Sequence, residues 1–377
     1  MFVWQVRTDL DKRAAVWYNP SRINITDCED MDMKEIRVGV VNWDCSLTRD
    51  TFFGYYQTRT LSPKKYREYT PYYADIVHEN RIEYHTRDQK AFDLELQYAV
   101  DAGIDYFTYV YYPEQGSRAH NSVTYADVSH RVYELAYARR MHASSHLRHK
   151  IGMAFIVTPI HPMADEDLLE LTAFFREPYY EKIDGRPLVY VYLRADILLM
   201  ERVHAACLAQ GLPAPYFVPM AYSLPKEQDS PLIEAISQYA CVKSGITTYE
   251  ELSGEMIRQN RIRLGFGHRV IPHFTVGWDP TPRIDLPSPW VQYPEASYAA
   301  IASPADLMQG AKLLADWVCD EAAAAFTGHI LTFAWNEFEE GAWICPTYTQ
   351  EQKINTDRIA AFAEISAYWK QRLLSLL

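Results

Sequence analysis

The sequence predicts an α/β protein, a single (β/α)₈ barrel over residues 36–377 that follows an N-terminal extension at residues 1–35 packed on its outside. Apolar, β-branched runs alternate eight times with helical patterns, which is typical of a parallel sheet with right-handed crossovers. No strand is followed by the glycine-rich phosphate loop expected of an open doubly wound sheet, so closure into a barrel is favoured. The length of 377 residues suits a barrel, and no linker or change of composition marks a second domain.

Each predicted strand is an apolar run that leads into a loop. The first run, Ile36 to Val41, ends in the polar group Asn42-Trp43-Asp44, as a buried strand entering a loop should. The eight strands are predicted at 36–41, 104–110, 150–157, 187–193, 215–221, 239–244, 269–276 and 329–335.

Helical patterns fill the segments between these strands, and Gly103 is a typical stop for the first of them. Two long loops, 44–85 and 277–303, each follow a strand. They should therefore lie at the C-terminal face of the barrel, where this fold builds its active sites. The helices are predicted at 87–102, 123–143, 165–176, 196–210, 230–237, 249–263, 304–326 and 353–373.

The charge balance argues against nucleic acid as a partner. The 37 basic and 49 acidic residues give a net charge of -12, which repels a phosphate backbone, and the sequence shows no basic patch that would override it. No run approaches the roughly 20 apolar residues of a membrane span. No membrane partner is expected, and the absence of an export signal from the given sequence favours a cytoplasmic location. The six scattered cysteines fit free thiols in a reducing compartment.

The aromatic content favours a carbohydrate partner. The chain has 28 Tyr and 9 Trp, many of them beside polar residues in predicted loops. Sugar rings present flat C–H faces, and amphipathic aromatic side chains can cover such faces while their polar tips stay hydrogen-bonded. Ordinary filling of the core is the alternative explanation for the same residues.

The strongest local signal is the apolar run that ends in Trp335-Asn336 and leads directly into Glu337-Phe338-Glu339-Glu340. A single turn of backbone would place Glu337 and Glu340 on one side and turn Glu339 elsewhere. Two carboxylates close together beside an aromatic wall repel each other, so one can donate a proton while the other accepts one. Glycoside hydrolysis needs this division of labour. Alternatively, these acids cap a loop or pair with surface cations.

Three motifs resemble glycoside hydrolase family 99 and the family-99-like proteins of bacterial polysaccharide loci. Trp335-Asn336-Glu337-x-x-Glu340-Gly341 resembles the NE-x-x-E-G signature that closes the family's barrel. Ala102 to Phe107 resembles its second strand, and Gly277 to Arg283 resembles a motif of the family-99-like branch. The resemblance implies a TIM-barrel glycosidase that acts on an α-linked glycan, such as an α-mannoside-containing polysaccharide, with retention of configuration.

The resemblance also implies a role for each glutamate. Glu337 corresponds to the carboxylate that deprotonates the sugar 2-hydroxyl, and Glu340 to the acid/base that protonates the leaving oxygen. The implied intermediate is a 1,2-anhydro sugar, and a hydroxyl already held on the substrate has the proximity advantage of an intramolecular nucleophile. Phe338-Glu339 stands where the family usually has Trp-His, so mannose specificity is not carried over.

Further candidates for contact with the substrate lie after predicted strands. Asp279 could bind a sugar hydroxyl and Arg283 could hold it or an anionic substituent, although an aspartate can equally fix a proline-rich turn. The candidate substrate-binding residues are Trp43, Asp44, Tyr111, Tyr112, His161, Tyr222, Trp278, Asp279, Arg283, Trp335 and Asn336.

No metal or other cofactor is expected. His142, His146 and His149 have a spacing close to that of a zinc pair, but no HExxH pattern is present and the segment is crowded with arginines. These histidines are better interpreted as cations at the C-terminus of a helix.

Two other functions remain open from the sequence. A glycosyltransferase or polysaccharide-biosynthesis enzyme could use the same barrel, but the sequence has no DxD motif after a strand and no phosphate cradle. A non-catalytic carbohydrate-binding barrel is the other alternative, and it would have no need for two like charges at close range. Fold alone does not decide among these functions.

Overall fold

The computed structural model describes residues 35–43, 45, 48–122, 124–242, 245, 247–293 and 299–377. The predicted N-terminal extension at 1–35 lies outside the described residues except for Glu35. The prediction of an extension therefore stays a prediction.

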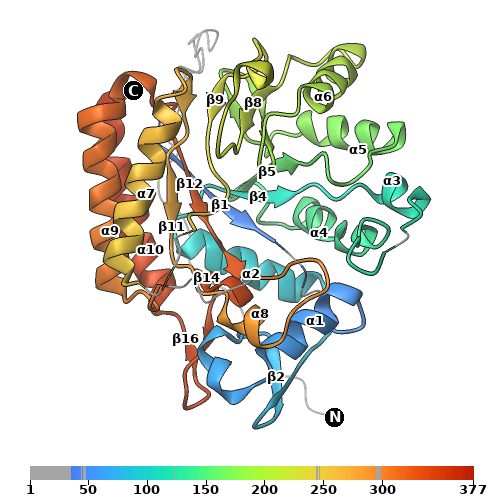
Figure 1. Ribbon diagram of the computed structural model, residues 1–377, viewed down its shortest axis with the longest axis vertical. Helices are drawn as coiled ribbons and strands as arrows, with labels where there is room; N and C mark the ends of the chain where they lie inside the picture. Colours follow the sequence, from blue (N-terminus) through green and yellow to red (C-terminus); the bar gives the residue numbers. More distant parts are fainter. Residues whose placement is uncertain are drawn as a thin grey trace, which may run out of the picture. The chain divides into compact units, whose positions relative to one another are not determined.

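Eight parallel strand positions close into a barrel, as the sequence predicts (Figure 1). Strand β1 pairs with β4 on one side and with β12 on the other, and the sheet continues from β4 through β5 and β7 to β8. Hydrogen bonds between backbone groups join β8 to the segment of β9, β9 pairs with β10, and β11 pairs with β12. The strands are β1 (Arg37–Asn42), β4 (Tyr106–Val110), β5 (Gly152–Val157), β7 (Arg186–Val191), β8 (Tyr216–Pro219), β9 (Ala235–Ile236), β10 (Arg269–Val270) with β11 (His273–Thr275), and β12 (His329–Phe333).

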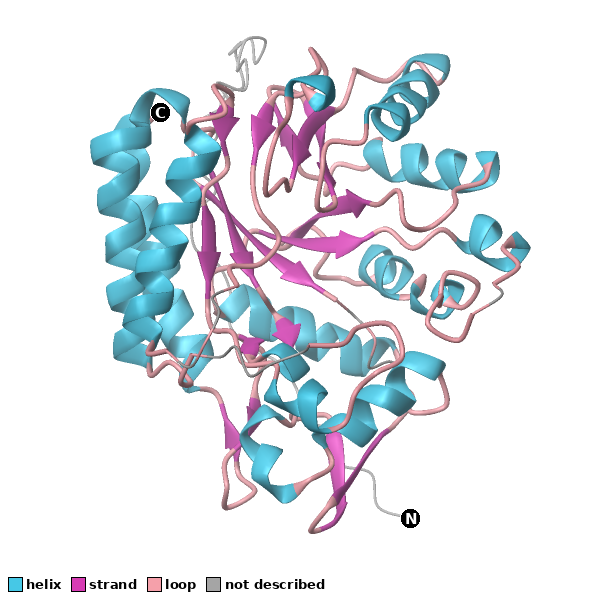
Figure 2. Ribbon diagram, viewed as in Figure 1, coloured by secondary structure: helices cyan, strands magenta, loops and turns pink. Residues whose placement is uncertain are grey.

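Helices surround the barrel, with α7, α9 and α10 packed together on one side and α5 and α6 on another (Figure 2). Helix α9 begins at a capping box formed by Ser303 and Asp306, and α7 begins at one formed by Thr248 and Glu251. The helices are α2 (Gln89–Asp101), α3 (Glu114–Ala119), α4 (Ala138–Ser144), α5 (Asp165–Phe175), α6 (Ile197–Ala209), α7 (Tyr249–Leu264), α9 (Pro304–Trp317) and α10 (Asp357–Leu373).

Both long loops contain secondary structure of their own, and these pieces gather at one end of the barrel (Figure 1). The first loop holds α1 (Phe52–Leu61), a 3₁₀ segment (Lys64–Tyr69) and the hairpin of β2 (Ala74–His78) and β3 (Arg81–Tyr84). The second holds α8 (Thr281–Asp285). Two further short pairs follow the last barrel strand, β13 (Asn336–Glu337) with β14 (Ala342–Trp343) and β15 (Thr347–Tyr348) with β16 (Ile354–Asn355), and β6 (Lys182–Ile183) pairs with β7.

The prediction for the sixth βα unit is wrong. The helix predicted at 230–237 does not form, and the sixth strand, β9, occupies its last part, whereas residues 239–242 of the strand predicted at 239–244 form no strand and residues 243 and 244 lie outside the described residues. Glu234 and Ser237 donate backbone hydrogen bonds to Phe217 and Pro219 in the region of β8. A short apolar run is compatible with either a strand or a buried helix, and here the neighbouring strand decides.

The prediction of a helix at 123–143 is also largely wrong, because only the end of this segment is helical, in α4. A 3₁₀ segment at Val132–Leu135 precedes α4, and the described residues before it form turns. The Asp127 side chain accepts a hydrogen bond from the Ser129 backbone N–H at 3.0 Å. Such local side-chain bonds compete with helix formation. The predicted helix 304–326 is α for its first part only, and continues as a π segment at Val318–Ala322.

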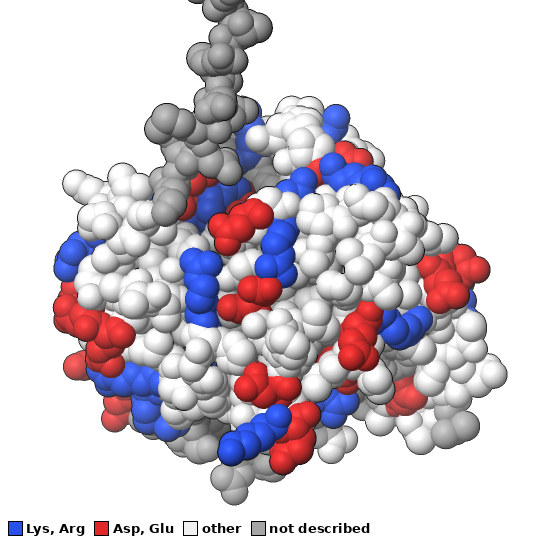
Figure 3. Space-filling model, turned by 90° about the horizontal axis from the view of Figure 1, so that it is seen from above, with Lys and Arg blue, Asp and Glu red and all other residues white. Residues whose placement is uncertain are grey.

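The described surface in Figure 3 shows acidic and basic side chains interspersed over one face of the molecule. This mixture, with the net charge of -12, offers no extended basic surface to a phosphate backbone on the described part of that face. In the described part of the chain, no helix combines the length and the apolar character that crossing a membrane requires.

Candidate active site

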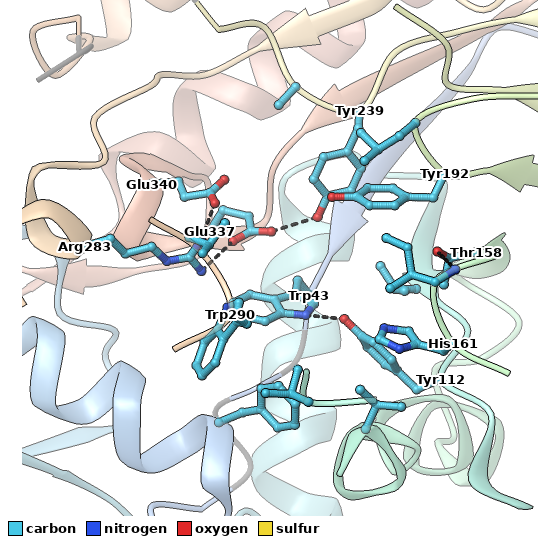
Figure 4. A pocket seen from close by; sticks show the side chains of 18 of the residues that line it. Trp43, Tyr112, Thr158, His161, Tyr192, Tyr239, Arg283, Trp290, Glu337 and Glu340 are labelled. Carbon is cyan, nitrogen blue, oxygen red and sulfur yellow. Dashed lines mark hydrogen bonds and ion pairs between the residues drawn. The ribbon is translucent and has the colours of Figure 1, made fainter. Parts of the chain in front are cut away.

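A cavity of about 550 Å³ opens where the C-terminal ends of the barrel strands meet the long loops. Glu337, Glu340 and Arg283 lie on one side of it, and Tyr112, Thr158 and His161 lie on the other (Figure 4). The cavity is therefore an aromatic chamber with both glutamates on one wall, and Asp127, which accepts a hydrogen bond from the Ser129 backbone, also lines it.

The two glutamates reach the same wall through a tight local turn. Glu337 ends β13, a 3₁₀ turn covers Phe338–Glu340, and Gly341 ends the turn with a φ of 71°. Glu337 and Glu340 line the cavity, whereas Glu339 is fully buried away from it. This is the arrangement that the three-residue spacing predicts.

Arg283, from α8, is the cation that all three glutamates share. It is 3% exposed, and its guanidinium forms a close ion pair with Glu340 and a longer one, 3.3 Å, with Glu339. Its Nη2 lies 3.8 Å from Oε2 of Glu337. Burial alone would lower the pKa of Arg283, but Glu340 and Glu339 raise it well above the ordinary value, so this side chain keeps its charge. One cation thus faces three acidic groups.

The environment of Glu337 strongly perturbs its pKa. Burial raises its pKa well above the ordinary range, and the neighbouring Glu340 raises it further, against the opposing effects of Arg283 and of a hydrogen bond from Tyr239. Tyr239 donates to Oε1 of Glu337 at 2.8 Å, and Oε2 has no hydrogen-bond partner among the described residues. Glu337 therefore keeps its proton to a higher pH than an ordinary glutamate does.

Glu340 is held by a second donor in addition to Arg283. The hydroxyl of Tyr293 donates to its Oε1 at 2.7 Å. Burial, followed by the charge of Glu340, raises the pKa of Tyr293, so the hydroxyl stays protonated and available as a donor. Each cavity glutamate thus accepts a hydrogen bond from a tyrosine of its own, Glu337 from Tyr239 and Glu340 from Tyr293.

The remaining walls are mainly aromatic. The Trp43 indole donates a hydrogen bond to the hydroxyl of Tyr112, and the Arg283 guanidinium lies 5.3 Å from the centre of the Trp43 ring. His161, on the opposite wall, lies 3.1 Å from the Ser129 hydroxyl, and burial lowers its pKa to about 4. It is therefore a neutral hydrogen-bonding group near pH 7.

Eight residues named from the sequence line this cavity. They follow β1 and other strands or lie in the loops after them, so the end-of-strand rule for barrels located a large part of the cavity lining. These residues are Trp43, Tyr112, His161, Tyr222, Trp278, Arg283, Glu337 and Glu340.

Two other candidates, Tyr111 and Trp335, do not line the cavity. Tyr111 points toward α5 and donates to the carbonyl of Asp167 at 2.6 Å, and the Trp335 indole donates to Glu95 at 2.7 Å. Neither side chain lines the cavity, because each is buried against its own partner. Asp44 lies outside the described residues.

Asn336 and Asp279 have supporting positions. The Asn336 side chain accepts a hydrogen bond from the backbone of Trp43 at 2.8 Å and so helps to place that ring. Asp279 accepts from the Thr281 backbone at 3.0 Å and from the hydroxyl of Tyr69. These contacts agree with the alternative interpretation of Asp279, in which its side chain fixes the proline-rich turn.

The sequence interpretation missed several residues of the cavity. Tyr192 and Tyr239 lay in predicted strands, where alternate residues face the core, so neither was named. Trp290 and Tyr293 lie in the long loop 277–303, whose path the sequence did not predict. The signal that could have found them is the concentration of aromatic residues in a loop on the C-terminal face.

The interpretation of His142 as a helix-terminal cation is wrong. Its ring is buried and lies 3.0 Å from the Tyr109 hydroxyl and 2.9 Å from the Ile151 carbonyl. Burial lowers its pKa to about 4, so it is neutral near pH 7. Among the described residues, no group of three or more His, Cys, Asp or Glu side chains is arranged to hold a metal ion.

Neither a family model nor a curated protein matches the sequence. Among solved structures, the endo-α-mannosidase of glycoside hydrolase family 99 from Bacteroides thetaiotaomicron in complex with bis-tris-propane superposes with a TM-score of 0.55. The chain is similar in fold to family 99. The identity is 10%, and the match covers 89% of this chain and 98% of that one; a second structure of the same enzyme gives a TM-score of 0.52 at the same identity and coverage. The resemblance to family 99 that the motifs indicate is thus confirmed at the level of the fold.

Close backbone packing around Gly341 leads to the first testable prediction. A Cβ on Gly341 would lie 2.5 Å from the Cβ of Asp279, in addition to the cost of its positive φ. We expect Gly341→Ala to lower the free energy of unfolding by more than the ~1–3 kcal/mol of a left-handed non-glycine residue. Gly185→Ala is the matched control, because Gly185 has the same φ of 71° and open space around it. Urea unfolding measures both, and equal losses would show that the contact with Asp279 is unimportant.

Proposed function

We propose that the chain is a glycoside hydrolase that acts on an α-linked glycan, with Glu337 and Glu340 as its working pair. The observation that carries the proposal is the pair itself, two carboxyl groups with different partners on one wall of an aromatic cavity. The cavity lies at the C-terminal end of the barrel strands, where this fold performs its chemistry. The similarity in fold to family 99 supports the same proposal.

In the proposed reaction, Glu337 takes the proton of the substrate 2-hydroxyl while that oxygen attacks the anomeric carbon. The bond to the leaving oxygen breaks as Glu340 gives that oxygen its proton, and a 1,2-anhydro sugar remains. Water then attacks the anomeric carbon and gives a proton to Glu340, while Glu337 returns its proton to O2. Two inversions leave the configuration retained.

The environment of Glu337 suits a base. Its raised pKa means that, once ionised, it binds a proton more strongly than an ordinary glutamate, which favours removal of a proton from a hydroxyl. Tyr239 holds one carboxyl oxygen, and the other has no hydrogen-bond partner among the described residues and lies 3.8 Å from Nη2 of Arg283, so the side chain that lines the cavity keeps an unused acceptor. We propose an α-mannoside-containing polysaccharide as the first substrate to test, since the similar structure is that of an endo-α-mannosidase.

A hydrolysis screen tests the proposal. The purified chain is incubated with α-linked mannans, α-linked glucans and aryl α-glycosides, with Glu340→Gln as the control and EDTA in parallel. We expect sugar release that depends on Glu340 and is insensitive to EDTA, with an α-configured product at early times in NMR spectra. Consumption of a nucleotide-sugar donor alone, or binding of glycans without cleavage, would instead assign the barrel to transfer or to binding.

The pH dependence of kcat/KM gives a second prediction. Because Glu337 acts as a base, activity is lost as the pH falls through its pKa, and that pKa is raised. The acid limb should therefore lie above the ordinary glutamate range. Tyr239→Phe removes a hydrogen bond that lowers the pKa of Glu337, so the limb should move to still higher pH. If the acid limb of kcat/KM lies at the same pH in Tyr239→Phe as in the unmodified protein, Glu337 is not the group whose titration produces that limb.

A further inference from the structure

A second hollow lies at the start of α1, beside the candidate active site. Its volume is about 340 Å³, and none of the cavity glutamates lines it. We call it the tyrosine hollow, and its lining residues are Arg49, Asp50, Thr51, Phe52, Tyr55, Tyr56, Tyr125 and Arg131.

Trp290 connects the tyrosine hollow to the cavity. Its ring lines the cavity, beside Trp43 (Figure 4), and the centres of the two rings are 6.4 Å apart. The centre of the same ring lies 5.8 Å from that of Phe52 and 5.6 Å from that of Tyr56, and both of these residues line the hollow. Phe52 in turn contacts Tyr125 at 5.9 Å. A continuous series of aromatic rings therefore runs from the glutamate cavity to the surface.

The outer end of this series is unusually exposed to solvent. Tyr55 is 55% exposed and Tyr125 is 65% exposed, although large aromatic side chains elsewhere in the barrel are mostly buried. Single exposed apolar residues are ordinary, but several rings that share one hollow form a surface that a ligand can cover.

Charged groups edge these rings. The Arg131 guanidinium lies 4.7 Å from the centre of the Phe52 ring and is held there by an ion pair of 2.7 Å with Glu134. Asp50, with a side chain that is 81% exposed, and Arg49 stand at the same opening. Flat rings edged by charged donors and acceptors suit a pyranose, whose C–H face stacks while its hydroxyl groups form hydrogen bonds.

We infer that the tyrosine hollow is a distal subsite, which binds further sugar residues of the glycan whose scissile bond lies in the cavity. The inference rests on the proposed function and extends it, because it assigns the substrate to extended oligosaccharides or polysaccharides. A small glycoside would occupy the cavity alone and leave the exposed rings uncovered. The continuity through Trp290 is what favours one glycan chain over two separate ligands.

Calorimetry on the Glu340→Gln protein tests the inference without turnover. The probes are α-1,6-linked mannoheptaose with mannobiose, and maltoheptaose with maltose. We expect Tyr55→Ala with Tyr125→Ala to lower the ratio of heptasaccharide to disaccharide affinity about tenfold, since two stacking rings are lost. Tyr137→Ala is the matched control, because Tyr137 is also 55% exposed but lines neither the cavity nor the tyrosine hollow. It should leave the affinity ratio unchanged. Thermal unfolding checks that each variant is folded.

Three results would overturn the inference. The first is an affinity ratio that the double variant leaves unchanged. The second is that neither heptasaccharide binds to the Glu340→Gln protein in which Tyr55 and Tyr125 are intact. The third is self-association of the chain that the double variant abolishes, because the exposed rings would then form a contact between two copies. The hydrolysis screen is a separate measurement, so a chain that cleaves glycans with an unchanged ratio keeps its proposed function and loses only the distal subsite.

Discussion

Glu337→Gln and Glu340→Gln are each expected to lower kcat by about 10²–10⁴-fold, the usual contribution of a positioned acid or base. Glutamine keeps the size of the side chain and can still accept hydrogen bonds from Tyr239 or Tyr293, so glycan binding should largely survive. Rates on the substrate found in the screen, together with calorimetric affinities, measure the two effects separately.

A substrate with an activated leaving group separates the two roles. The dinitrophenolate of a dinitrophenyl α-glycoside departs without a proton, so Glu340→Gln should recover most of kcat/KM on this substrate, which reports the first step, although hydrolysis of the intermediate still lacks its base. Glu337→Gln should not recover, because activation of the 2-hydroxyl is still required. Recovery in Glu337→Gln alone would make Glu337 the acid and Glu340 the base. Normal rates in both variants would show that neither glutamate takes part in catalysis.

Glu339→Gln is the matched control for these variants. Glu339 is fully buried next to Arg283, like the other two glutamates, but it does not line the cavity. Glu339→Gln should lower kcat far less than Glu337→Gln or Glu340→Gln does. An equal loss would show that the charge of the whole cluster, and not contact with substrate, sets the rate.

The sequence was sufficient for the barrel and for the position of the glutamate pair. Both follow from local patterns, namely the alternation of apolar runs with helices and an acidic turn directly after a buried strand. The sixth strand was misplaced because the run before Ala235–Ile236 has no period of its own, and the neighbouring β8 determines its conformation. The correct predictions are those for which the local sequence is enough, without contacts to residues far away in the chain.

The electrostatic arrangement of the site depends on distant partners and could not be predicted. Arg283 was expected to hold Asp279 or an anionic substituent, whereas the fold brings it to Glu339 and Glu340, more than fifty residues along the chain. Tyr293 reaches Glu340 from a loop whose path has no signature in the sequence. Only the tertiary structure determines which donors surround a given carboxylate.

Arg283→Met should have the largest effect on stability, a loss of about 3–5 kcal/mol in the free energy of unfolding near pH 7. The substitution leaves Glu337, Glu339 and Glu340 together at a buried site with no cation in contact among the described residues. Burial already raises the pKa values of Glu337 and Glu339 and Arg283 opposes that rise, so without Arg283 these two values should lie further above those of the unfolded chain and the folded protein binds more protons. Stability should therefore fall as the pH rises from 5 to 8, and be partly restored at the acid end.

The pH dependence distinguishes loss of charge from loss of packing. Arg263→Met is the matched control, because Arg263 is also 3% exposed but donates to the carbonyls of Ala221 and Gln259 instead of to carboxylates. Its stability loss should change little between pH 5 and pH 8. Adding Glu339→Gln to Arg283→Met should recover part of the loss, since one buried acid is then neutral. A loss in Arg283→Met that is the same at both pH values would mean that the three glutamates are already protonated, and that Arg283 acts through packing and not as their counter-ion.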